Sequence, residues 1–298
     1  MEEIRPFVKW AGGKNSLIPQ ISTYYPSELK NNKIETYIEP FVGGGAVLIN
    51  ILQNYDVKHT YAFDINKDLI NCYNVIKNNV EALIKKLDEK EKKYMSLEMD
   101  DRKEYFYDVR KEYNSYQLTG KKDIKRASEF IFLNKTCFNG LYRVNKKDEF
   151  NVPFNNAKKP PICDSTNLRN LSKLIRNVEF ICGNYYESEQ YIKGKTFVYF
   201  DPPYRPLNVT SGFTSYTKFD FNDEDQKKLA EYYSKIDSKN VKLMLSNSNP
   251  KNTDKKDTFF EDLYAKFNIH EIYAKRMINS KASGRGEISE LLITNYKD

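Results

Sequence analysis

The stretch "TYIEPFVGGGAVLINILQNYDVKHTYAFDI", residues 36–65, decides the fold class. A β-branched and aromatic run at 36–41 is followed by a glycine turn, a helical pattern and a second strand-like run at 59–65. Further strand-like runs lie downstream, at 178–185, 196–204, 241–248, 268–274 and 288–296. Strands that alternate with helices predict parallel βαβ units, and therefore an α/β protein. The last two runs have no helix between them, so we predict an antiparallel pair at the sheet edge, joined by "SKASGRG".

The alternation stops between residues 66 and 165. The sequence there, "VEALIKKLDEKEKKYMSLEMDDRKEYFYDVRKEYNSYQ", predicts charged amphipathic helices with Leu, Ile, Tyr and Phe on one face. The segment closes with "FNGLYRVNKKDEFNVPFN", in which the polar turn "NKKDE" is flanked as in a β-hairpin. We therefore predict an α/β domain made of residues 1–67 and 164–298, interrupted by a helical domain at 68–163.

Composition limits the classes of protein that remain. The chain has 298 residues, a formal net charge of +7 and a pI near 8.9, which favours a polyanionic partner, although an excess of lysine also serves solubility. No apolar run is long enough to span a bilayer and the start of the chain has no signal-peptide pattern, so we expect a cytoplasmic protein. Four widely spaced cysteines and two histidines argue against a disulfide framework and a zinc site, and no metal is implied.

Two features of the opening stretch indicate a cofactor site. Glycines 43–45 let the backbone approach a ligand at the start of a helix, although such a turn often serves only to reverse the chain. Asp64 ends the next strand, where doubly wound folds place an acid that accepts hydrogen bonds from a ribose diol. "WAGGK" lacks the Ser or Thr of a P-loop, and "GGG" does not match the dinucleotide spacing G-x-G-x-x-G. A smaller adenosine-containing cofactor is therefore predicted.

A second candidate site is "DPPY", residues 201–204, directly after a strand-like run. Ligands of open α/β sheets bind beyond the carboxyl ends of the strands. The prolines make the turn rigid and supply carbonyls without competing N–H groups. Asp201 and the Pro202 carbonyl could accept both hydrogens of an amino group while Tyr204 offers a stacking face, which suits a planar aryl amine. The alternative is a strand-end turn without chemistry.

Several long motifs occur in one order along nearly the whole chain. They are "FVKWAGGK" (7–14), "EPFVGGG" (39–45), "FDINKDLIN" (63–71), "FNGLYRVN" (138–145), "FNVPF" (150–154), "VYFDPPY" (198–204) and "FTSYT" (213–217). In this order the sequence resembles the Dam-type DNA adenine methyltransferases of bacteria and phages. The resemblance implies a Rossmann-like, S-adenosylmethionine-dependent methyltransferase sheet with an inserted helical DNA-recognition domain. It also implies methyl transfer to the exocyclic amino group of adenine in double-stranded DNA.

The resemblance assigns roles to individual residues. Its cofactor-binding positions are matched by Trp10, Lys14, Asp64 and Asp201, with Glu39, Phe41, Gly43 and Gly45 in the adjoining glycine turn. Its catalytic motif is matched by Asp201, Pro202 and Tyr204. The positions that insert into DNA or contact base edges in members that target GATC are matched by Lys9, Phe138, Asn139, Leu141, Arg143 and Pro153. Lys135 stands where the family usually has arginine, so a bidentate phosphate clamp becomes a point charge.

Some alternatives stay open on the residues alone. Trp10 could belong to the core, and Phe138 could pack under the hairpin instead of between bases.

The resemblance implies base flipping followed by direct transfer, because the target adenine is unreachable inside a duplex. Three other protein classes are alternatives: an RNA or protein-glutamine methyltransferase, a non-catalytic DNA-binding protein and a nucleotide-dependent oxidoreductase. The hairpin motif argues against the first class, the intact "DPPY" against the second and the glycine spacing against the third. We expect a monomer, and a solitary or a restriction-modification role are both compatible with the sequence.

Overall fold

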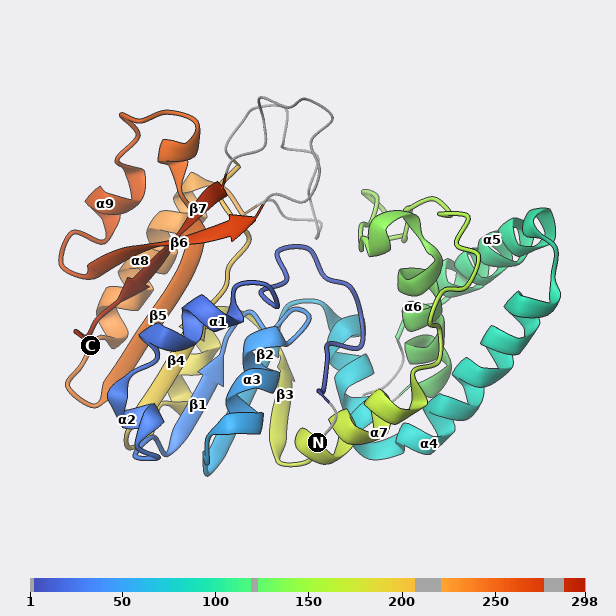
Figure 1. Cartoon of the computed structure of the whole chain (residues 1–298), viewed down its shortest axis with the longest axis horizontal. Coiled ribbons are helices and arrows are strands. Elements are labelled where there is room, and N and C mark those ends of the chain that lie inside the picture. The colour runs from blue at the N-terminus through green and yellow to red at the C-terminus, as the bar shows by residue number, and fades with distance from the viewer. Residues whose placement is uncertain (1–2, 119–122, 207–220, 276–286, 298) are drawn as a thin grey trace.

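The computed structural model describes residues 3–118, 123–206, 221–275 and 287–297. The chain folds into two parts that lie side by side, one around a β-sheet and one built of long helices (Figure 1). The N-terminal segment before helix α1 runs between the two parts, as the dark blue trace in Figure 1 shows. This arrangement confirms the predicted α/β class with a helical insertion.

Seven strands form one sheet in the order β3-β2-β1-β4-β5-β7-β6. Their bounds are β1 Thr36–Glu39, β2 His59–Asp64, β3 Val178–Cys182, β4 Thr196–Phe200, β5 Val241–Ser248, β6 Asn268–Lys275 and β7 Glu287–Thr294. Strands β1 to β5 are parallel, whereas β7 is antiparallel to both β5 and β6. All seven predicted strands are present and the antiparallel pair at the edge is confirmed, while its predicted loop at 280–286 lies outside the described residues.

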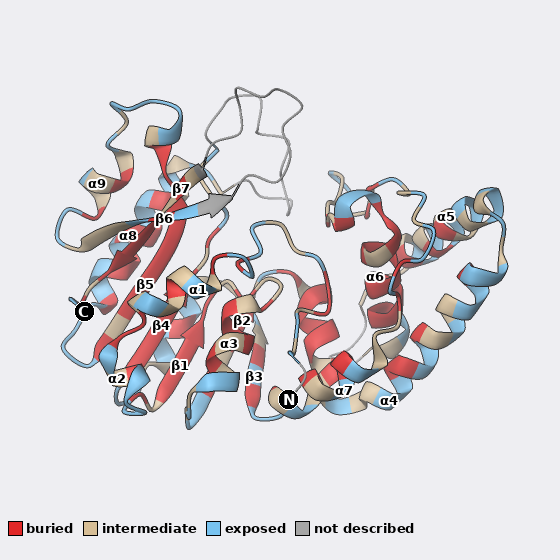
Figure 2. Cartoon of the chain, viewed as in Figure 1, coloured by how far each residue is buried: buried red, intermediate tan, exposed pale blue. Residues whose placement is uncertain are grey.

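The side chains of β4 alternate between two cores. Phe197 and Tyr199 belong to one core and Val198 and Phe200 to the other, and all four are fully buried. Helices over the first face are α1 Ile18–Ile21, α2 Ser27–Lys30, α3 Ala46–Asn54 and α7 Ser165–Leu174; those over the second are α8 Asp223–Ile236 and α9 Phe259–Leu263. Short 3₁₀ turns are η1 Ser22–Tyr24, η3 Tyr185–Tyr191 and η5 Pro250–Asn252. Because both faces are covered (Figure 2), the central strands β4 and β5 are buried along almost their whole length.

The helical part consists of α4 Lys67–Ser96, α5 Met99–Ser115 and α6 Ile124–Thr136. The first turns of α4 pack on the sheet, where the Tyr73 ring stacks on Phe180 of β3 with 4.5 Å between centroids. Beyond a kink at Asn79, α4 packs against α6 through Tyr94 and Phe132. Helix α4 thus contributes to both parts, and the exact domain limits stay a prediction. None of the described helices is long and apolar enough to cross a membrane.

Residues 138–155, the hairpin arm, follow α6. Antiparallel bridges join two pairs of residues, Val144 with Phe150 and Cys137 with Phe154. A 3₁₀ turn, η2 Phe138–Gly140, opens the arm, with Asn139 and Gly140 at φ angles of 55° and 64°. Left-handed backbone cannot continue a strand, so the predicted hairpin is paired at isolated bridges and not along a continuous ladder.

Candidate active site

A cavity of about 1560 Å³ lies at the carboxyl ends of the parallel strands. Its walls come from the N-terminal segment, from the loops that follow β1 to β4, and from the hairpin arm. All the predicted cofactor-binding and catalytic residues line it, together with Lys9, Lys135 and Asn139. The other predicted DNA-contacting residues do not line it and lie on the arm: Phe138, Leu141, Arg143 and Pro153. Segments distant in sequence meet here because the ends of parallel strands share one edge.

The glycine turn after β1 packs too tightly for side chains. Gly45 has a φ of 76°, and a Cβ atom there would lie 2.5 Å from the Tyr73 hydroxyl. A Cβ atom at Gly43, with a φ of 46°, would lie 2.8 Å from Cδ1 of Trp10. The Tyr73 hydroxyl also donates a hydrogen bond of 2.9 Å to the Gly43 carbonyl. Packing and backbone conformation therefore both require glycine at these two positions. As a result, no side chain of the turn covers the start of helix α3 on the side of the cavity.

Asp64 joins the end of β2 to this turn. Its Oδ2 accepts a hydrogen bond from the Gly43 amide at 3.1 Å, and its Oδ1 accepts one from the Asn66 amide at 2.8 Å. Burial raises the pKa of Asp64 to about 6, although both amides oppose this shift. Ile65 follows with half of its side chain exposed in the cavity wall. Sequence reasoning missed Ile65, although an apolar residue directly after the strand-end acid is a readable signal.

Glu39, at the end of β1, is buried beneath the same turn. The Tyr37 hydroxyl donates a hydrogen bond of 2.6 Å to its Oε2. Burial raises the pKa of Glu39 well above its usual range, and the nearby Asp201 charge adds to the shift. Phe41 stacks on Tyr185 with 5.5 Å between ring centroids and closes the neighbouring wall.

Asp201 and Lys14 form a partly buried ion pair, with 2.9 Å between Nζ and Oδ1. The Lys14 ammonium also donates to the Gly12 carbonyl at 2.6 Å and lies 4.5 Å from the centre of the Tyr204 ring. Oδ1 of Asp201 is buried, and the Lys14 ammonium is the cation that faces it. Burial raises the pKa of Asp201 to about 6, with Lys14 limiting the shift.

Residues that the sequence did not single out hold "DPPY" in place. The Tyr204 hydroxyl donates a hydrogen bond of 2.6 Å to Oε2 of Glu290 on β7. The Pro203 carbonyl accepts a hydrogen bond of 2.9 Å from Gln226 on α8, whose own Oε1 accepts one from Asn247 on β5. Gln226 and Asn247 are buried. An acid within the apolar run "ISELLITNY" was the available signal for Glu290, whereas nothing local marks the other two.

Trp10 contacts the inserted part as well as the glycine turn. Its ring stacks on Tyr142 at 5.7 Å and on Phe130 of α6 at 6.4 Å between centroids. The residue is only partly buried and lines the cavity, so it bridges the two parts of the molecule. Lys135, at the end of α6, has its pKa lowered by burial, while Asp164 opposes the shift.

The hairpin arm presents one exposed ring and one anchored arginine. The Phe138 side chain is 51% exposed, and its amide donates to the Pro153 carbonyl at 2.8 Å. Packing of Phe138 under the hairpin is therefore not observed. Nε of Arg143 donates a hydrogen bond of 2.7 Å to Oδ1 of Asn151 across the arm. This bond does not use the two terminal nitrogens of the guanidinium. Leu141 is only half-buried.

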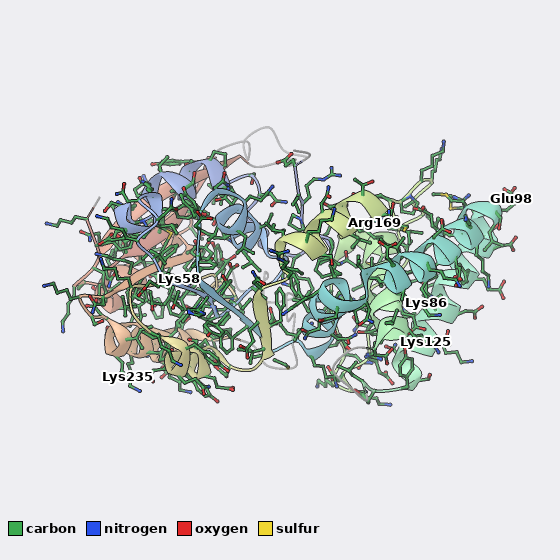
Figure 3. The ribbon with its side chains drawn as sticks, turned by 90° about the horizontal axis from the view of Figure 1, so that it is seen from below. Lys58, Lys86, Glu98, Lys125, Arg169 and Lys235 are labelled. Carbon is green, nitrogen blue, oxygen red and sulfur yellow. The ribbon has the colours of Figure 1, made fainter. Side chains whose placement is uncertain are left out.

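Surface charge does not by itself mark a DNA-binding face. Four of the cations labelled in Figure 3 form exposed ion pairs: Lys58 with Glu35, Lys125 with Glu112, Arg169 with Glu81 and Lys235 with Glu189. Such pairs typically contribute about 0–1 kcal/mol. They occur on both parts of the molecule (Figure 3), so the net charge of +7 is compatible with a polyanionic partner but does not locate it.

The sheet order, the reversed seventh strand and the position of the cavity define the class of protein. A glycine turn after β1 and an acid after β2, both at the carboxyl edge, are the arrangement of the Rossmann-like methyltransferases.

Comparison with known proteins gives the family. Residues 10–278 match the family described as D12 class N6 adenine-specific DNA methyltransferase. The chain is 52% identical to the type II methyltransferase M.MjaIII of Methanocaldococcus jannaschii, across 99% of this chain and 100% of that protein. It is 38% identical to the type II methyltransferase M1.LlaDCHI of Lactococcus lactis, across 98% and 96%. Identity to the DNA adenine methylase of Escherichia coli K12 is 32%, across 98% and 95%. The chain belongs to the D12 class N6 adenine-specific DNA methyltransferase family, which confirms the predicted enzyme class.

Proposed function

We propose that this enzyme transfers the methyl group of S-adenosylmethionine to the exocyclic amino group of an adenine flipped out of duplex DNA, within the sequence GATC. The observation that supports it best is the carboxylate of Asp201, which lines the cavity at the end of β4 and is held there by its ion pair with Lys14. A carboxylate has about four lone-pair sites, so one ammonium leaves acceptor capacity on it. An adenine amino group that enters the cavity can donate to the remaining sites.

The residues of the cavity fit the methyl donor. Each oxygen of Asp64 accepts one backbone amide and keeps lone pairs for the hydroxyls of a ribose. Ile65 offers an apolar face for the adenine ring of the donor. A single small-molecule site occupies about 300–1000 Å³. The larger volume here, about 1560 Å³, leaves room for both the donor and an extruded base.

The catalytic roles follow from the geometry around "DPPY". Asp201 and the Pro202 carbonyl accept the two amino hydrogens, which leaves the nitrogen lone pair directed away from them. S-adenosylmethionine supplies a sulfonium methyl group, an electrophile that needs no covalent enzyme intermediate. Tyr204 stacks on the base while Glu290 holds its hydroxyl. The Lys14 ammonium lies 4.5 Å from the centre of the Tyr204 ring and holds the Asp201 carboxylate by an ion pair.

One assay tests the proposed function. The protein is incubated with S-adenosylmethionine labelled in its methyl group, together with DNA duplexes of varied sequence, structured RNA and a peptide that contains glutamine. Label recovered as N6-methyladenine from the GATC duplex is the expected result. Label recovered only from RNA or peptide, or in DNA bases other than adenine, would falsify the proposal.

Arg143→Ala is expected to relax discrimination at the outer base pair of the target. An arginine that presents its fork to the acceptor edge of guanine contributes about 1–3 kcal/mol of discrimination. The bond to Asn151 pre-orients this guanidinium, so the loss should lie near the upper end. The measurement compares kcat/KM on GATC with kcat/KM on duplexes altered at that base pair.

Lys146→Ala is the matched control, because this exposed cation lies on the same arm beyond Arg143. It should lower the rate on all duplexes alike, as a phosphate contact does. If Arg143→Ala also lowered all the rates equally, Arg143 would contact the backbone only, and the assignment of base recognition would be wrong.

The dependence of the methylation rate on pH should show the titration of two carboxyl groups. Because the pKa values of Asp64 and Asp201 are both raised to about 6, both are ionised above that pH and become neutral acceptors of poor strength below it. With both substrates far below KM, the rate should fall as the pH drops through 6, approaching about a hundredfold per pH unit. Asp64→Asn should reduce the limiting slope to about tenfold per unit. A wild-type rate that is flat between pH 5 and pH 7 would contradict both roles.

A further inference from the structure

The segment Lys9–Trp10 is held between the cofactor turn and the hairpin arm. On one side, a Cβ atom at Gly43 would lie 2.8 Å from Cδ1 of Trp10, so the ring rests directly on the glycine turn. On the other side, the same ring stacks on Tyr142 of the arm. In Figure 1 this N-terminal segment runs between the two parts of the molecule. Any shift of Lys9 relative to the arm therefore also changes the arm's position relative to the cofactor turn.

One buried side chain fixes this segment to the arm. Asn134, in the last turn of α6, is 2% exposed. Its Oδ1 accepts a hydrogen bond of 3.0 Å from the Lys9 amide, and its Nδ2 donates to the Lys9 carbonyl at 2.9 Å. Nδ2 also donates to the Gly140 carbonyl at 2.8 Å. Both amide hydrogens are thus used by carbonyls of two different segments, and losing either bond would leave a buried polar group unsatisfied.

The two segments that Asn134 joins are in close contact. Gly140 has a φ of 64°, and a Cβ atom there would lie 2.6 Å from Cδ of Lys9. Phe138 and Asn139, the two residues before it, are exposed. The exposed pair thus projects from a turn whose position is set by Lys9 and Asn134.

We propose that Asn134 is a positioning residue for target recognition. It holds Lys9 and the exposed pair Phe138–Asn139 in register with the glycine turn, although its own side chain does not line the cavity. The inference rests on the proposed function and assigns to it a residue that contacts neither the base nor the donor. A displacement of about 1 Å in a positioning element can cost about 10²-fold in rate. The rate should fall mainly on the preferred DNA sequence, because only that sequence makes the contacts that depend on the position of Lys9 and of the pair Phe138–Asn139.

The test uses Asn134→Asp, which keeps the size of the side chain and the acceptor for the Lys9 amide. It replaces the donor by a second oxygen facing two carbonyls. The preferred duplex is first identified with the wild-type protein by sequencing methylated positions in random DNA. The ratio of kcat/KM on this duplex to kcat/KM on single-base-pair variants is then measured. We expect the ratio to fall by about tenfold or more, chiefly through kcat. The affinity of the DNA-free protein for S-adenosylmethionine, measured by calorimetry, should stay unchanged.

Two further variants make the result specific. Thr136→Val removes one hydrogen bond of 2.7 Å within the same helix from an equally buried side chain, and it should leave the ratio unchanged. Gly140→Ala forces the turn away from Lys9 without changing Asn134, and it should lower the ratio as Asn134→Asp does. Gly140→Ala decides the question if Asn134→Asp does not fold. A wild-type ratio in a folded Asn134→Asp or Gly140→Ala variant, or an equal loss in Thr136→Val, overturns the inference.

The outcomes separate this inference from the proposed function. If the wild-type protein methylates no duplex, the proposed function fails. If the wild-type protein discriminates between duplexes and Asn134→Asp discriminates equally well, only the role of Asn134 fails.

Discussion

Methyl transfer by Asp201→Asn is expected to fall by about 10²–10³-fold in kcat, the usual cost of removing one preorganised polar group from a reaction centre. The Asp201 carboxylate, ion-paired with Lys14, is the acceptor that the amino hydrogen of adenine needs, and an amide offers a neutral oxygen and a competing donor in its place. Single-turnover transfer of labelled methyl groups to a preformed DNA complex measures this step directly.

The same substitution should not destabilise the fold. Burial raises the pKa of Asp201 to about 6 even with Lys14 beside it, so above pH 6 the ionised carboxylate is less favourable in the folded than in the unfolded chain. The free energy of unfolding of Asp201→Asn at pH 8 should therefore equal or exceed that of the wild type, as urea titration would show.

Asp257→Asn is the matched control for Asp201→Asn. Asp257 accepts a hydrogen bond of 2.6 Å from Arg205, directly after the "DPPY" turn, but does not line the cavity. Its substitution tests whether loosening the turn is enough to lower the rate, and we expect a change of less than about tenfold. An equal loss in both variants, or near-wild-type turnover by Asp201→Asn, would remove Asp201 from the reaction centre.

Asp64→Ala is expected to weaken the binding of S-adenosylmethionine by about 1.5–3 kcal/mol, the usual value of hydrogen bonds to a charged group. This corresponds to a dissociation constant about 10–150-fold higher. The Asp64 carboxylate also accepts a hydrogen bond from the Gly43 amide and so shapes the turn that the methyl donor approaches. Calorimetry on the DNA-free protein measures the affinity, and DNA binding without the donor should change little.

A matched control separates ligand binding from stability. Asp123 caps α6 by accepting a hydrogen bond from the Arg126 amide at 2.9 Å, and it lies outside the cavity. Asp123→Ala should lower the free energy of unfolding by about 0.5–2 kcal/mol, as loss of a helix cap does, and leave donor affinity intact. Unchanged donor affinity in Asp64→Ala would show that Asp64 serves only the turn.

The fold class and the location of the chemistry can both be predicted from the residues alone. Alternating strand-like and helical runs predicted all seven strands, because residue periodicity records which face of each element is buried. The glycine turn, Asp64 and "DPPY" were recognised locally, since each follows a strand whose end must lie at the ligand-binding edge of a parallel sheet.

The contacts among these residues, in contrast, follow from the way the whole chain folds. Lys14 pairs with Asp201, Glu290 holds the hydroxyl of Tyr204, and Asn134 ties Lys9 to the hairpin arm. No local pattern encodes these contacts, because each joins segments far apart in the chain. They depend on the order of the strands and on how the inserted helices pack against the N-terminal segment. Periodicity reports whether a side chain is buried, whereas its partner is set by the packing of the whole molecule.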